Sequence, residues 1–234
     1  MPASRLDRRQ VVVREHDVVG MYVADVPGFI GHIGIAAENH PGLSAAEGLR
    51  VTDMQPPLVR GGGPDQVHVH GTVPLTDPER EAIAFFLEQV EREYLASSCG
   101  DFAQYVVLPH HAPVIRPQDG SVVYRRFSCG GFVLEAYRFA GIDLIDTNEA
   151  SLPPVGLDVL RQSYADEQQL RVLGTPRLRE RFLGLAGDGP WPIVLPGYLL
   201  NSLVRTEAEI RAGPYRPRPG DEFFPAASAS GSPS

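Results

Sequence analysis

The chain has 234 residues, of which 43% are hydrophobic and 21% are charged, and its formal net charge at pH 7 is -8. This length and composition predict one globular domain with a sizeable core. The acidic balance argues against a protein that binds nucleic acid, because such proteins normally present a basic face. Two cysteines are too few for a disulfide framework or for a zinc site built from cysteines.

The two ends of the chain carry little folding information. The N-terminus, MPASRLDRRQ, is polar and does not resemble a signal peptide, and no apolar run is long enough to span a bilayer. We therefore expect a cytoplasmic protein, in which free thiols persist. Residues 213–234 are rich in proline and serine and lack a repeating apolar face, which predicts a disordered tail behind a single domain over residues 1–212.

Short β-branched segments dominate the first part of the chain. Residues 10–13 and 18–23 have the composition of strands. Residues 29–37 (FIGHIGIAA) are apolar or small on both faces, which predicts a central strand buried on both sides. Residues 49–54 (LRVTDM) predict the next strand, which ends at two prolines.

Three histidines fall in or after these strands. His32 lies inside the predicted central strand, where the simplest interpretation is a core histidine with hydrogen-bonded ring nitrogens. Residues 60–66 (RGGGPDQ) predict a flexible loop, and VHVHGTV after them predicts a half-exposed strand with His68 and His70. The His-x-His spacing puts both imidazoles on one face, as in a metal-binding pair. We expect solvent-facing strand histidines instead, with no metal and no cofactor.

The clearest predicted helix begins at Thr76, Asp77 and Pro78, which supply a cap and a proline in the first turn. Its apolar stripe continues almost to Cys99, where the helix ends. The residues after Cys99 have strand character, so this cysteine does not open a helix. We expect Cys99 to be structural.

The remaining elements are shorter. We expect a strand at 104–108, a turn at 110–113, an extended segment at 121–124, and helices over 155–164, 175–185 and 199–212. The segment 190–200 (PWPIVLPGYLL) is interrupted by proline and cannot form a regular helix throughout.

Cys129 stands at the start of another predicted helix, in the stretch FSCGGFVLEAYRFAGIDL (residues 127–144). Apolar residues recur after it with the spacing of one buried helix face, and Gly141 supplies a C-terminal stop. A thiol at a helix N-terminus feels the positive end of the helix dipole and unpaired backbone N–H groups, which favour thiolate over thiol. Cys129 is therefore a candidate nucleophile.

A nucleophilic cysteine requires an imidazole that accepts its proton and a polar group that orients the imidazole. His32 is the candidate base, because a buried strand is rigid enough to hold such a pair.

These residues also resemble a known family. SCGGFVLEAYRFAGIDL, which begins at Ser128, is similar to the nucleophile helix of NlpC/P60 papain-like cysteine peptidases, and GHIGIAAEN, which begins at Gly31, is similar to their histidine strand. His32 precedes Cys129 here, which is the order of the circularly permuted branch with the YiiX/YaeF-like and lecithin:retinol acyltransferase-like proteins. The resemblance covers about residues 18–164.

The resemblance implies an α+β fold in which an antiparallel sheet packs against the nucleophile helix. It also implies a third catalytic residue on the strand after the histidine strand. Asp53, on the next predicted strand, is the first choice for this residue, and a turn-capping carboxylate is its alternative role. His68 and His70 are second choices. The Cys129 backbone N–H would be one oxyanion donor, and Tyr124 would either add a hydroxyl or pack.

The expected function is a cysteine-dependent hydrolase or acyltransferase, of peptidase or amidase type, that acts on an amide or ester bond. Its partner would be a small-molecule, peptide or acyl substrate. The alternative is a non-catalytic binding or interaction module on the same fold, in which Cys129 and His32 are merely buried.

Overall fold

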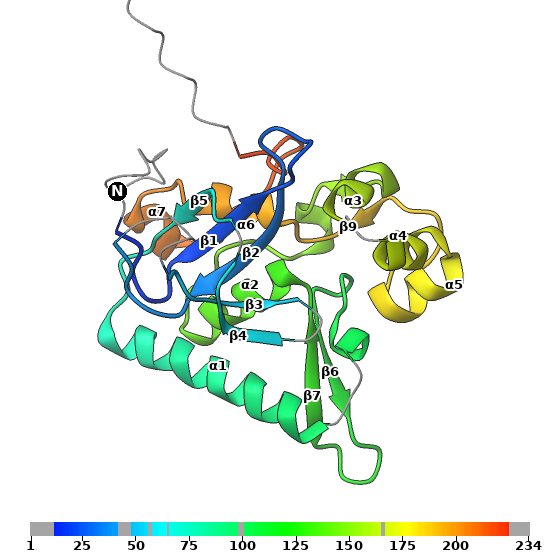
Figure 1. Ribbon diagram of the computed structural model, residues 1–234, viewed down its shortest axis with the longest axis horizontal. Helices are drawn as coiled ribbons and strands as arrows, with labels where there is room; N and C mark the ends of the chain where they lie inside the picture. The colour runs from blue at the N-terminus through cyan, green and yellow to red at the C-terminus, as the bar shows by residue number, and fades with distance from the viewer. Residues whose placement is uncertain are drawn as a thin grey trace, which may run out of the picture.

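The structure is a computed structural model that describes residues 12–41, 48–55, 58–64, 66–97, 101–164 and 167–224. Its centre is an antiparallel sheet of five strands in the order β4-β3-β2-β1-β5 (Figure 1). The strands are β1 (Val18–Tyr22), β2 (Ile30–Ala36), β3 (Val51–Met54), β4 (Leu58–Gly62) and β5 (Val69–Gly71). The prediction of a central strand at β2 is confirmed, because β1 and β3 pair with its two edges. Consecutive residues of β2, which point to opposite faces of the sheet, are buried from residue 33 to residue 36.

Two helices build the core behind this sheet. Helix α2 (Cys129–Phe139) packs against β2 and β3, and helix α1 (Asp77–Ser97) packs against α2 (Figure 1). The side chains of Phe132, Leu134 and Tyr137 on α2 are fully buried. The Tyr137 hydroxyl donates a hydrogen bond of 2.7 Å to the backbone oxygen of His16, which ties α2 to the segment before β1. The chain is thus mixed α+β, as the sequence predicts.

Smaller elements surround this core. They are η2 (Asp101–Gln104), β6 (His111–Ile115), β7 (Val122–Phe127), η3 (Glu149–Ser151), β8 (Pro154–Val155), α3 (Leu157–Ser163), α4 (Glu167–Gly174), α5 (Pro176–Leu178), η4 (Arg179–Leu183), β9 (Trp191–Pro192), α6 (Pro196–Ser202) and α7 (Glu207–Ala212). Strands β6 and β7 form a hairpin that contacts α1, while α3, α4 and α5 gather beside one end of the sheet (Figure 1). Helix α6 packs against β1 and β2.

Several local expectations are wrong. The loop expected at 60–66 contains the end of β4, and the turn expected at 110–113 contains the start of β6. In both places a partner strand from elsewhere in the chain supplies the hydrogen bonds that local sequence does not foretell. The strand expected at 104–108 is reduced to one bridge, between Tyr105 and Phe127.

The helix expected over 199–212 is divided into α6 and α7. Thr206 separates the two because its side chain accepts a hydrogen bond from the backbone N–H of Glu209, and the Glu209 carboxylate accepts one from the Thr206 N–H. This capping box starts a new helix.

The C-terminal segment also departs from expectation. The sequence predicts disorder from residue 213 onward, but residues 213–224 pack against the domain: Phe224 is buried, and its N–H donates to the backbone oxygen of Gly28 at 2.7 Å. Tyr215 pairs with Ile145 in an isolated bridge. Individual aromatic residues hold this segment against the domain, so it needs no repeating apolar face. Residues 225–234 lie outside the described residues. None of the helices in the described parts of the chain is long and apolar enough to cross a membrane.

Candidate active site

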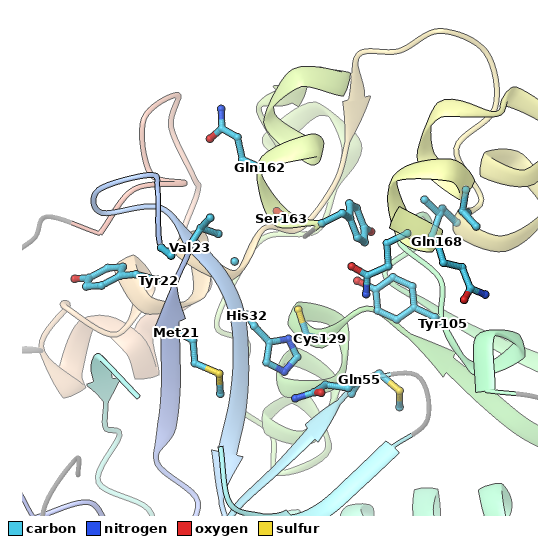
Figure 2. Close-up of a pocket in the computed structure, with 17 residues that line it drawn as sticks. Met21, Tyr22, Val23, His32, Gln55, Tyr105, Cys129, Gln162, Ser163 and Gln168 are labelled. Carbon is cyan, nitrogen blue, oxygen red and sulfur yellow. The ribbon is translucent and has the colours of Figure 1, made fainter. Parts of the chain in front are cut away.

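Cys129, His32 and Asp53 come from three different elements and meet at one place. His32 lies on β2, Asp53 on β3, and Cys129 is the first residue of α2. His32 and Cys129 line a cavity of about 590 Å³ (Figure 2). In Figure 2 the imidazole of His32 lies beside the thiol of Cys129. Residues that are almost one hundred positions apart in sequence are thus neighbours.

The start of α2 is built to hold Cys129 in position. Ser128 is the N-cap, and its hydroxyl accepts a hydrogen bond of 2.9 Å from the backbone N–H of Gly131. Gly131 lies so close to the backbone of His110 that a Cβ would be 1.8 Å from the His110 oxygen. The start of this helix therefore requires a glycine at position 131. The sequence interpretation missed this role of Gly131.

The His32–Asp53 pair is held by sheet geometry. Nε2 of His32 lies 2.6 Å from Oδ2 of Asp53, and the Asp53 side chain is 5% exposed. Gly34, on the same face of β2 as His32, permits this approach, because a Cβ there would be 2.8 Å from the Cβ of Asp53. Of the two roles considered for Asp53, the geometry matches the orienting group of an imidazole.

The electrostatics favour an imidazolium at His32. Burial lowers the pKa of His32, but the negative charge of Cys129 and hydrogen bonds to Asp53 and Cys129 outweigh burial and raise the pKa to about 10. Because Nε2 faces Asp53, Nδ1 is the ring nitrogen left for the Cys129 thiol. The imidazole is 22% exposed, so it remains accessible from the cavity.

Two tyrosines lie near the Cys129 thiol. Tyr105 and Tyr164 line the cavity, and their hydroxyls are hydrogen-bonded to each other. Burial raises the pKa of both phenols, and the charge of Cys129 raises each further. Both tyrosines therefore stay protonated. Their mutual hydrogen bond raises the pKa of Tyr105 and lowers that of Tyr164, so Tyr105 is the donor and the O–H of Tyr164 is left to donate near Cys129.

Gln55 forms a further contact beneath the imidazole (Figure 2). Its Nε2 donates a hydrogen bond of 2.8 Å to Oδ2 of Asp53, the oxygen that also faces His32. Gln55 is exposed and lines the cavity. The rest of the lining is a mixture of neutral polar and apolar side chains: Met21, Tyr22, Val23, Ala24, Gly31, Met54, Gln162, Ser163, Gln168, Gln169, Val172 and Leu183.

The other sequence candidates lie elsewhere. Nδ1 of His68 accepts a hydrogen bond of 3.0 Å from the backbone of Tyr22, and Nε2 of His70 lies 3.8 Å from Asp17, so neither contacts His32 in place of Asp53. Within the described residues, no group of three or more His, Cys, Asp or Glu side chains is arranged to hold a metal ion.

Tyr124 is also absent from the described residues that line the cavity. Tyr124 pairs with Val114 in the β6–β7 hairpin, and the hydroxyls near the thiol come from Tyr105 and Tyr164 instead. Cys99 falls outside the described residues.

The sequence interpretation missed three residues of the site, and only one of them has a signal in the local sequence. Ser128 carried a recognisable signal, because a serine directly before an apolar helical run is a preferred N-cap. Tyr105 and Tyr164 carried none, since only the folded chain brings them to Cys129.

Comparisons with known proteins return no relative. No protein-family model matches the chain, no curated protein matches it, and no solved structure matches it.

Proposed function

We propose that this protein is a cysteine-dependent hydrolase or acyltransferase that cleaves an amide or ester bond through a thioester on Cys129. The observation that carries the proposal is the meeting of Cys129, His32 and Asp53 at the wall of a cavity. The raised pKa of His32 agrees with it, since a buried histidine without a charged partner would have its pKa lowered by burial.

In the first half of the reaction, the Cys129 thiolate attacks the substrate carbonyl carbon and the new C–S bond forms. The negative charge that develops on the carbonyl oxygen is met by the Cys129 backbone N–H, which has no acceptor within the helix, and by the Tyr164 hydroxyl, whose proton is not used in the bond with Tyr105. The His32 imidazolium then gives its proton to the leaving nitrogen or oxygen, and the C–N or C–O bond breaks.

In the second half, water or an amine attacks the thioester. His32, now neutral, takes a proton from this nucleophile, the C–S bond breaks, and the thiolate–imidazolium pair is restored. Asp53 keeps Nδ1 of His32 directed at Cys129 throughout. Water as acceptor makes the protein a hydrolase, and an amine makes it an acyltransferase.

The architecture that we propose for this chemistry is a circularly permuted NlpC/P60-like, papain-like domain. Three features support it: the histidine strand precedes the nucleophile helix, the orienting residue is on the following strand, and the sheet packs on α2. The substrate would be a small-molecule, peptide or acyl compound that reaches the protein in the cytoplasm.

Thiol reactivity tests this proposal. Iodoacetamide at pH 7, followed by peptide mass spectrometry, is expected to label Cys129 much faster than Cys99. The variant His32→Ala is expected to slow labelling of Cys129 and leave Cys99 unchanged. Equal and slow labelling of both cysteines in the native protein would overturn the enzyme and favour a non-catalytic binding module.

A further inference from the structure

Gln55 lines the same cavity as Cys129 and His32. It follows β3 by one residue and is exposed. Its amide lies below the His32 ring in Figure 2. Any acyl compound bound at Cys129 is therefore in the neighbourhood of this amide.

The orientation of the Gln55 amide follows from its partner. Oδ2 of Asp53 lies 2.6 Å from Nε2 of His32 and 2.8 Å from the Gln55 side chain. An ionised carboxylate only accepts hydrogen bonds, so the atom that faces it must be the Gln55 NH₂ group. The Gln55 oxygen is then on the other branch of the amide, and it can only accept.

A fixed acceptor at the wall of a cavity discriminates between substrates. An amide with an N–H satisfies it, whereas an ester, with an oxygen in that place, offers two acceptors facing each other. Sites that contain an oriented polar group reject analogues that cannot pair with it, because the group loses its hydrogen bond to water without replacement.

Resting on the function proposed above, we propose that Gln55 is a positioning and specificity residue: its NH₂ group holds Asp53 toward His32, and its oxygen accepts a hydrogen bond from a substrate N–H, which selects amides over esters. The carboxamide links recognition to catalysis, because the group that meets the substrate also orients the carboxylate behind the imidazole.

Two alkylating reagents test the selectivity without the natural substrate. Iodoacetamide has N–H donors, and methyl iodoacetate carries the same reactive carbon beside an ester. The rate of Cys129 modification by each is divided by the rate of the same reagent with glutathione. We expect the corrected ratio of amide to ester to be about fivefold in the native protein, the worth of one neutral hydrogen bond, and about one in Gln55→Met.

The matched control is Gln66→Met. Gln66 is hydrogen-bonded to a side chain two residues away, as Gln55 is, through a contact of 3.1 Å with His68, but it does not line the cavity. Its ratio should equal that of the native protein. A native ratio near one, or a ratio unchanged in Gln55→Met, overturns the inference while fast labelling of Cys129 leaves the proposed enzyme standing. Slow labelling of Cys129 by both reagents overturns the two together.

The positioning role has its own readout. In Gln55→Met the carboxylate of Asp53 is no longer held toward His32. The contact of 2.6 Å between them should loosen, so the pKa of His32, about 10 in the native protein, is expected to fall in an NMR titration of the imidazole. Gln66→Met should leave that titration unchanged. A fall in the alkylation ratio with an unchanged His32 titration would refute the positioning half.

Discussion

Replacing Asp53 by asparagine tests whether the carboxylate behind His32 has the function that its position indicates. Asp53→Asn retains the shape of the side chain and removes its charge. The contact between Nε2 of His32 and Oδ2 of Asp53 is 2.6 Å long, slightly shorter than the distance of about 2.7–2.9 Å in charge-assisted N–H···O hydrogen bonds. Such a bond contributes about 1.5–3 kcal/mol.

This energy can be converted into an expected change in the pKa of His32. Because 1.36 kcal/mol corresponds to one pKa unit, Asp53→Asn should lower the pKa of His32 from about 10 by about one to two units. NMR of a protein with labelled histidines measures this shift. Cys129→Ser should lower the same pKa by more, since the charge of Cys129 contributes more to it than the contact with Asp53.

The control is a second buried carboxylate near a histidine. Asp17 lies 3.8 Å from His70, and its side chain is 5% exposed, as that of Asp53 is. Asp17→Asn should leave the His32 titration and the alkylation rate of Cys129 unchanged in protein that is verified as folded. A His32 pKa that stays near 10 in Asp53→Asn would refute the role of Asp53.

Three further predictions concern the oxyanion donor, the helix start and pH stability. Tyr164→Phe should slow acylation of Cys129 by about tenfold or more through loss of one donor, measured by rapid-quench mass spectrometry, while thermal unfolding changes little. An unchanged rate would remove Tyr164 from the mechanism. Gly131→Ala should lower the free energy of unfolding by about 1–3 kcal/mol in urea titrations, because its Cβ meets the His110 oxygen, and wild-type stability would contradict that contact. Burial lowers the pKa of His16 from 6.5, so its contribution to stability is complete above pH 6.5 and is lost as the pH falls. His16→Asn, which tolerates the positive φ of 72° at this position, should weaken the acid dependence of thermal unfolding, and an identical pH profile would contradict the assignment.

Those features that depend on one element's own pattern could be predicted from the sequence. The helix at Cys129 and its stop near Gly141 were visible in the spacing of apolar residues, and the strand with His32 was visible in a run that is apolar on both faces. The prediction of Asp53 came from the family resemblance, which implies a third catalytic residue on the strand after the histidine strand. The sheet places it there.

Features that depend on distant partners could not be predicted. The hairpin at β6 and β7 forms because two weak strands pair with each other, and Tyr164 reaches the thiol only because α3 packs near β2. The hydrogen bond from Gln55 to Asp53 depends on how the chain turns after β3. The sequence around each of these residues does not indicate which distant residues it will contact.

The most direct test of the proposed chemistry is capture of the thioester. The protein is mixed with excess p-nitrophenyl acetate, quenched in acid within the first turnover, and analysed by intact-mass and peptide mass spectrometry. We predict one acetyl group on Cys129, removed by hydroxylamine, with much slower formation in His32→Ala and none at this position in Cys129→Ala. Acetyl groups spread over lysines with none on Cys129, or equal rates in the native protein and His32→Ala, would contradict a thioester mechanism at Cys129.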